Sequence, residues 1–110
     1  MIKHIAEHEF EMFVLQSRKK VVLVDFWAQW CAPCRTMDPI LESIARRFTM
    51  TLDVIKVNVD DEPRLAKVSG VKSIPTIIFF KNGKPVMDQI LIGTKTEGEL
   101  TGIVNTLVSN

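Results

Sequence analysis

The hydrophobic and polar positions of the chain repeat with different spacings in successive segments, and each spacing predicts an element. Apolar residues at helical intervals predict a first helix over residues 10–17. An apolar run over residues 21–28, interrupted by Asp25, indicates a strand that is covered on both faces. Over residues 34–48 apolar side chains recur at steps of three and one, which predicts a strongly amphipathic helix.

The second half of the chain contains two further β-rich segments and a hairpin. Residues 54–59 and 76–80 are the β-rich segments, and the acidic, proline-containing stretch after the first predicts a short helix over residues 60–68. Asn82-Gly83 is a strong hairpin signal, because both residues adopt positive φ readily. Residues 86–92 are then predicted to form the return strand of this hairpin.

The last predicted helix begins at a capping box, in which Thr96 and Glu99 can each accept the other's backbone N–H. The order of elements is therefore helix, strand, helix, strand, helix, hairpin, helix. A long helix joins the first two strands, so these strands lie parallel, and the hairpin adds antiparallel strands. The sequence predicts an α/β fold with a mixed central β-sheet flanked by helices on both faces. The length of 110 residues fits one domain, residues 1–110.

Charge and composition narrow the classes of function. The 14 Lys and Arg residues nearly balance the 13 Asp and Glu residues, and a net charge of +1 gives no basic excess for nucleic acid or membrane surfaces. No stretch approaches the roughly 18 apolar residues of a membrane-spanning helix. The acidic N-terminal segment lacks the apolar region of a signal peptide. We therefore expect a cytoplasmic protein that binds neither nucleic acid nor membranes.

The candidate chemistry lies in the two cysteines of the chain, Cys31 and Cys34. A disulfide that closes so short a loop contributes only roughly 2 kcal/mol in the chain-entropy model, which favours chemistry over structure. The pair lies between a buried strand and a long helix, where free backbone amides and the helix dipole stabilise a thiolate. We expect Cys31 to be exposed with a lowered pKa, and Cys34 to be shielded one turn further in. Pro33 stiffens the loop between them.

A set of short motifs resembles one known family over essentially the whole chain. In chain order the motifs are Val24-Asp25-Phe26-Trp27-Ala28, Trp30-Cys31-x-Pro33-Cys34, Pro39, Lys56-Val57-Asn58-Val59-Asp60, Ile74-Pro75-Thr76, Phe80-Lys81-Asn82-Gly83 and Gly93. This set is similar to the thioredoxin family, and the ordered set is far more specific than a C-x-x-C pair alone. The resemblance implies the thioredoxin fold and an activity in thiol–disulfide exchange.

The resemblance also implies roles for four of these residues. Cys31 would be the nucleophile and Cys34 the resolving cysteine. Asp25 interrupts an apolar run, where burial raises the pKa of a carboxyl group. The resemblance implies that Asp25 accepts the proton of Cys34, with Lys56 as its modulator. A buried ion pair between Asp25 and Lys56, without a catalytic part, is the alternative.

A binding surface for substrate proteins is implied around the cysteines. Trp30 lies beside Cys31, and we expect it to contribute to an exposed apolar rim. From sequence statistics the Ile74–Pro75 bond would be trans, whereas the resemblance implies that it is cis and that the Ile74 backbone pairs with an extended substrate chain. The expected substrate-binding residues are Trp30, Ala32, Pro33, Ile74, Pro75, Ile92 and Gly93.

Three features depart from the usual pattern of the family. Ala32 stands where glycine is usual and reduces the freedom of the loop between the cysteines. Arg35 replaces the usual lysine and keeps its charge. The stretch over residues 83–93 is about two residues longer than usual, which preserves strand alternation but leaves the register of Ile92 and Gly93 open.

The expected function is that of a monomeric protein disulfide reductase that acts on disulfide-containing substrate proteins and binds no metal or organic cofactor. By resemblance, a thioredoxin reductase that draws on NADPH reduces its Cys31–Cys34 disulfide. Two other interpretations stay open, namely an oxidase or isomerase of an oxidising compartment and a non-catalytic binding subunit. His4 and His8 complete a nominal zinc-ligand set with the cysteines, but its order and spacing argue against zinc.

Overall fold

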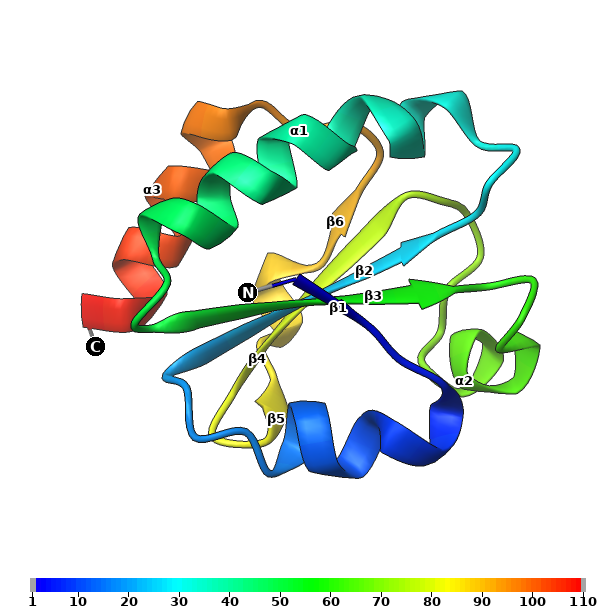
Figure 1. Ribbon diagram of the computed structural model, residues 1–110, viewed down its shortest axis with the longest axis horizontal. Coiled ribbons are helices and arrows are strands. Elements are labelled where there is room, and N and C mark those ends of the chain that lie inside the picture. Colours follow the sequence, from blue (N-terminus) through cyan, green and yellow to red (C-terminus); the bar gives the residue numbers. More distant parts are fainter. Residues whose placement is uncertain (1, 110) are drawn as a thin grey trace.

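The computed structural model describes residues 2–109 as a six-stranded mixed sheet between two helical layers (Figure 1). The strands are β1 (Ile2–His4), β2 (Val21–Trp27), β3 (Leu52–Asn58), β4 (Thr76–Lys81), β5 (Lys84–Pro85) and β6 (Leu91–Ile92). The helical elements are η1 (Glu7–Glu9), η2 (Glu11–Leu15), α1 (Ala32–Arg47), α2 (Pro63–Val68), η3 (Met87–Gln89) and α3 (Glu97–Ser109). The predicted α/β class is confirmed.

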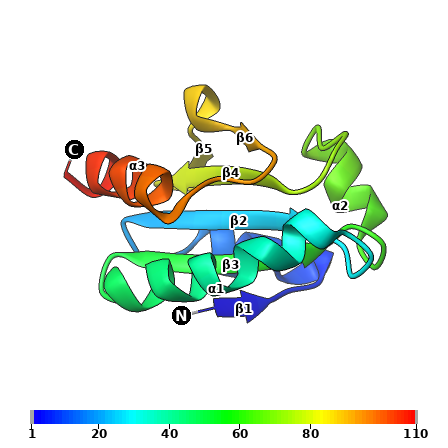
Figure 2. The same cartoon turned by 90° about the horizontal axis from the view of Figure 1, so that it is seen from above.

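The central strand of the sheet is β2, which pairs in parallel with β3 and antiparallel with β4. The order β1-β3-β2-β4-β5, with β6 also on β4, is visible in Figure 2. The parallel pair follows from the long α1 crossover, since the chain needs a helix to return to the same end of the sheet. One consequence of this register is that Asp25 of β2 lies opposite Lys56 of β3.

The two faces of the sheet have separate hydrophobic cores, because successive side chains of a strand point to opposite sides. Val21 and Leu23 of β2 lie in the core under α1 and α3. Val22 and Val24 lie in the other core, which η2, α2 and the N-terminal segment cover. Figure 1 shows α1 and α3 on one side of the sheet and α2 with the N-terminal helical turns on the other. A strand buried on both faces explains the nearly continuous apolar run in its sequence.

The first helical segment differs from the expectation for residues 10–17. It consists of the 3-10 turn η1 and the π-helix η2, in which the N–H of Gln16 donates to the carbonyl of Glu11 at 2.8 Å. Val14 is buried, whereas Leu15 is exposed. The spacing of a few apolar residues identifies a helical segment but does not separate an α-helix from a slightly wider one. Strand β1 was not predicted, because three residues are too few to show alternation.

The predicted return strand over residues 86–92 is wrong. Two short strands take its place, β5 and β6, and the 3-10 turn η3 separates them. In the register that pairs Phe80 with Pro85, Thr76 would face Gln89, but it faces Ile92, three residues further along. The turn therefore absorbs three residues at the sheet edge, and β6 rejoins β4 in a new register. Pro85, which has no backbone N–H to donate, ends the first piece.

The turn and helix-terminus residues predicted for the other elements are confirmed. The hairpin after β4 turns through Asn82 at φ 55° and Gly83 at φ 75°. Helix α2 begins at Pro63, and Gly70, at φ 78°, follows its end. At the start of α3 the Thr96 N–H donates to Glu99 at 3.0 Å, and the Glu99 N–H donates to Thr96 Oγ1 at 3.1 Å.

Candidate active site

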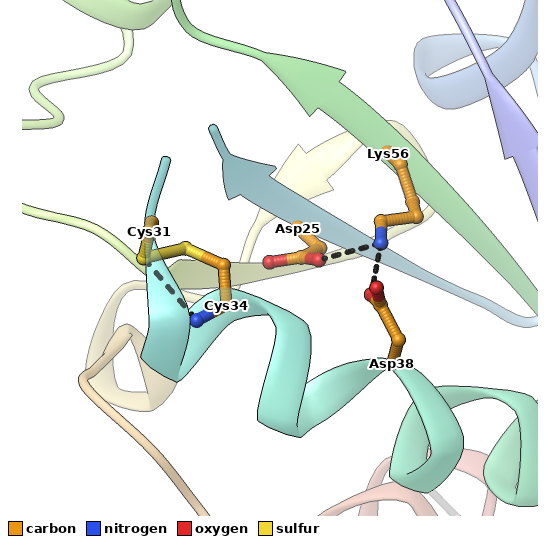
Figure 3. Close-up of polar contacts among 5 residues, drawn as sticks. All are labelled: Asp25, Cys31, Cys34, Asp38 and Lys56. Carbon is orange, nitrogen blue, oxygen red and sulfur yellow. Dashed lines mark hydrogen bonds and ion pairs between the residues drawn. A yellow bond between two sulfur atoms is a disulfide. The ribbon is translucent and has the colours of Figure 1, made fainter. Parts of the chain in front are cut away.

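The connection from β2 to α1 places both cysteines at the N-terminus of the long helix. Cys31 is the N-cap residue of α1 and Cys34 lies in its first turn. The two residues form a disulfide with their Cα atoms 5.3 Å apart (Figure 3). The Cys34 N–H donates to Cys31 Sγ at 3.2 Å, so the first sulfur occupies the position of a capping acceptor. The predicted location at a helix N-terminus is confirmed.

Both sulfurs are covered by the surrounding side chains. Cys31 is 4% exposed and Cys34 is 1% exposed. The expectation of an exposed Cys31 is therefore wrong for the disulfide form, in which Trp27, Val59 and Ile74 pack against the cysteine cluster.

Asp25 and Lys56 lie beneath the first turns of α1, on the same sheet face. The Asp25 side chain is fully buried, and its carboxylate lies between the disulfide and the Lys56 ammonium in the view of Figure 3. Lys56 Nζ is 3.7 Å from Asp25 Oδ2, which makes an ion pair, while neither Asp25 oxygen has a hydrogen-bond donor among the described residues. Burial raises the pKa of Asp25 to about 7, although the charge of Lys56 opposes this rise.

Lys56 makes two further contacts that fix its ammonium group. The ammonium donates a hydrogen bond to Asp38 Oδ1, which lies on α1, and it lies 4.8 Å from the centre of the Trp27 ring. The sequence analysis did not single out Asp38. The signal was present, because Asp38 follows Cys34 by four residues and therefore lies on the same face of the helix.

The rim around the disulfide is largely apolar and partly exposed. Trp30 is 68% exposed, and its indole N–H donates to Asp60 Oδ2 at 2.8 Å, which fixes the ring at the surface. Ala32 and Pro33 are exposed on the first turn of α1. A cleft beside the disulfide is lined by Trp30, Val59, Ala66, Val71, Lys72, Ser73 and Ile74. Of these, only Trp30 and Ile74 were predicted as binding residues. Val59 follows β3, and the others come from α2 and the loop after it.

The remaining predicted binding residues meet at the start of β4. The Ile74–Pro75 peptide bond is cis, as the resemblance implied. Gly93 has φ 89°, and its N–H donates to the Pro75 carbonyl at 2.8 Å. Ile92 is 62% exposed beside this contact, whereas Pro75 is buried. The shifted register of β6 therefore places Ile92 opposite Thr76 and Gly93 beside Pro75 despite the longer loop.

Within residues 2–109, no group of three or more His, Cys, Asp or Glu side chains is placed to hold a metal ion. The His4 ring packs edge-on against Trp27, with ring centres 5.6 Å apart, and His8 is exposed. Over the same residues no helix is both long and apolar enough to span a membrane.

The fold and the site define a class of protein. A disulfide at a helix N-terminus, above a buried carboxyl group and beside an apolar rim, is the arrangement of a thiol–disulfide oxidoreductase.

The sequence comparisons agree. The thioredoxin family model matches residues 1–106. The chain is 35% identical over 108 residues to a thioredoxin of Porphyra purpurea, covering 98% of each protein. It is 43% identical over 84 residues to a thioredoxin of Rickettsia bellii, covering 76% of this chain and 79% of that one. It is 38% identical over 105 residues to a thioredoxin of Acidithiobacillus ferridurans, covering 96% of this chain and 94% of that one. The chain belongs to the thioredoxin family and is a protein disulfide reductase.

Proposed function

We propose that Cys31 is the nucleophile of this reductase and that Cys34 resolves the mixed disulfide. The observation that carries this assignment is the capping contact from the Cys34 N–H to Cys31 Sγ. In the dithiol form the same amide and the positive end of the helix dipole favour a Cys31 thiolate over a thiol. Cys34 lies inside the helix and is the more deeply buried of the two.

The proposed reaction transfers two electrons from the cysteine pair to a substrate disulfide. The Cys31 thiolate attacks one substrate sulfur, forms a mixed disulfide and releases the other sulfur as a thiolate, which takes up a proton. Cys34 gives its proton to the Asp25 carboxylate and attacks Cys31 Sγ. The Cys31–Cys34 disulfide forms, and the second substrate thiolate leaves.

The buried carboxyl group supports the proposed proton transfer. A base works best when its pKa lies near the working pH, and burial raises the pKa of Asp25 to about 7. Lys56 moderates this rise, because its positive charge favours the ionised carboxylate. We therefore assign Asp25 as the proton acceptor and Lys56 as its modulator.

The apolar rim is the proposed binding surface for substrate proteins. Trp30 and Ile74 line a cleft beside the disulfide, and Ile92 is exposed next to the segment that follows Ile74. An exposed apolar surface of this kind suits extended segments of partner proteins. The complete proposed set is Trp30, Ala32, Pro33, Ile74, Pro75, Ile92 and Gly93.

The cycle needs a reductant for the Cys31–Cys34 disulfide. We propose a thioredoxin reductase that uses NADPH, so that the chain carries electrons between that enzyme and its targets without a metal or organic cofactor of its own. A reducing compartment such as the cytoplasm provides these conditions. We further propose that residues 1–110 form one thioredoxin domain, which acts as a monomer.

Insulin reduction by dithiothreitol tests the proposed function. We expect the wild-type chain to accelerate the reaction strongly and the Cys31→Ser variant to leave it at the uncatalysed rate. Circular dichroism of both proteins shows that each is folded. Equal rates for the two proteins would contradict the assignment and would favour a binding role for the apolar rim.

A further inference from the structure

The Lys56 ammonium lies between two carboxylates that belong to different elements (Figure 3). Asp25 approaches from β2 and is fully buried, whereas Asp38 approaches from α1 with its side chain 44% exposed. The Lys56 side chain is itself only 7% exposed. The buried Lys56 ammonium therefore forms ion pairs with two carboxylates. Its distance from each carboxylate decides how strongly it stabilises the ionised form of that group.

The contacts of Lys56 with the two carboxylates are unequal. Lys56 donates a hydrogen bond to Asp38, but its ammonium is 3.7 Å from the nearer Asp25 oxygen, which is beyond hydrogen-bond length. Asp25 therefore has the charge of Lys56 nearby without a hydrogen bond from it. A carboxylate that accepts a hydrogen bond from a cation is stabilised more than one that has only the cation's field.

We propose that Asp38 is a positioning residue, which holds the Lys56 ammonium away from Asp25 and so keeps Asp25 a strong base. This inference rests on the proposed role of Asp25 as proton acceptor for Cys34, and it adds a residue that adjusts this role. The Asp38 side chain bonds to Lys56 and acts through it.

Two effects of Asp38 act in the same direction. The hydrogen bond to Asp38 holds the Lys56 ammonium 3.7 Å from the Asp25 carboxylate, beyond the reach of its N–H donors. The negative charge of Asp38 also disfavours the ionised form of Asp25 and contributes to the raised pKa, after the larger contribution of burial. Without the Asp38 carboxylate, both effects disappear and Asp25 becomes easier to ionise.

The other charged groups around Lys56 provide a control. His4 on β1 is the register partner of Lys56, and Glu42 on α1 lines the same cleft as Asp38 and Lys56. Asp61 and Glu62 line a second cleft beside Lys56. Among the described residues, however, the ion pairs of Lys56 are those with Asp25 and Asp38. Glu42, one helical turn beyond Asp38, therefore carries the same charge without the contact.

The direct test measures the pKa of Asp25 in the oxidised protein, by an NMR titration of its carboxyl carbon. We expect Asp38→Ala to lower this pKa by about one unit, as a newly hydrogen-bonded cation does. Asp38→Glu should retain most of the wild-type value, because its carboxylate can still reach Lys56. Glu42→Ala removes the same charge from the same helix and should leave the pKa of Asp25 nearly unchanged. An unchanged or raised value in Asp38→Ala, or an equal fall in Glu42→Ala, would overturn the inference.

A second measurement separates the inference from the function on which it rests. Reduced protein releases two thionitrobenzoate ions from Ellman's reagent, and the second reports the attack of Cys34 on the mixed disulfide. The rate of this second release should rise with pH along an acidic limb. In Asp38→Ala we expect that limb to move to lower pH by the same amount as the pKa of Asp25. If the pKa of Asp25 falls but the rate profile stays, the positioning by Asp38 stands and the proton-acceptor role of Asp25 is wrong. If Asp25→Asn slows the second release while Asp38→Ala changes neither quantity, the proton-acceptor role stands and the inference fails.

Discussion

Leu23 and Asp25 lie two residues apart on the same face of the same strand, and both are completely buried under the helical layer. Leu23 belongs to the apolar core with α1 and α3, where burial stabilises the fold. Asp25 lies at the end of the strand near the disulfide, where burial penalises its ionised form. The strand therefore contributes to stability over its first residues, and its carboxyl end carries the proposed proton acceptor.

The largest effect should come from Cys34→Ser, which removes the chemistry and leaves the apolar core intact. Cys31 keeps its position at the helix N-terminus and should still attack substrate disulfides. A serine hydroxyl is far too weakly acidic to displace a thiolate near neutral pH, so covalent adducts should accumulate and turnover should cease. Non-reducing gels of the variant mixed with oxidised substrate protein, with and without dithiothreitol, measure this. Adducts on Cys31→Ser and none on Cys34→Ser would reverse the roles of the two cysteines.

The next effect should come from Leu23→Ala, which damages the stabilising part of the strand. Truncation of a fully buried leucine leaves a cavity, and we expect the free energy of unfolding to fall by about 2–5 kcal/mol. The rate of insulin reduction at low temperature, where the variant stays folded, should change little. Denaturant titration measures the stability. A loss of activity in folded Leu23→Ala would show that the two parts of the strand are not independent.

Asp25→Ala should change stability in the opposite direction to Leu23→Ala. We expect it to raise the free energy of unfolding and to slow turnover. The pKa of Asp25 is about 7 in the folded protein against 3.8 for an ordinary aspartate, so wild-type stability falls as pH rises from about 4 to about 7. The variant lacks this loss. Its free energy of unfolding should exceed that of wild type by at most about 4 kcal/mol at pH 8 and by little at pH 4. Lys56 keeps its partner Asp38 in the variant.

Thermal unfolding of Asp25→Ala and wild type at both pH values checks the stability, and insulin reduction at pH 7 checks the turnover. We expect turnover to fall by about tenfold or more, because the proposed acceptor is lost. A gain in stability that is the same at pH 4 and pH 8 would show that the ionisation of Asp25 is not its cause. Unchanged turnover would leave Asp25 with a structural role only.

The smallest effect should come from Gly102→Ala, on the exposed face of α3. Gly102 is an exposed residue within α3, and a Cβ built on it would have no atom within 4 Å. Alanine in a helix is favoured over glycine by about 1 kcal/mol, so the variant should be more stable by roughly that amount. Its rate of insulin reduction should equal that of wild type. Denaturant titration gives the difference, and a destabilised variant would mean that this helix face needs glycine.

The main elements and the position of the cysteine pair were predictable from local signals. The apolar run of β2, the periodic α1 and the capping box at Thr96 are each encoded within a short window, and each is confirmed. The cysteine pair could be placed at a helix N-terminus for the same reason. The cis bond before Pro75 followed only from the family resemblance, because sequence statistics favour the trans form.

The features that were missed depend on contacts distant in sequence. The split of the return strand follows from the two registers of β5 and β6 on β4, which alternation does not show. The π-helix η2 was missed because a few apolar residues do not separate it from an α-helix. The burial of Cys31 depends on Val59 and Ile74, which lie far along the chain. Asp38 was visible in principle through its helical spacing from Cys34, but its partner on β3 becomes evident only from the strand register.

The interrupted strand after the hairpin also affects self-association of the protein. A long, straight edge strand presents a row of unpaired backbone groups, on which a second chain can add as a further strand. Here one edge consists of β5 and β6, two residues each, with the turn η3 between them and Pro85 at the break. The opposite edge, β1, has three residues. Each edge therefore offers too short a template for strand addition, which protects a concentrated solution of the folded chain against aggregation through its sheet.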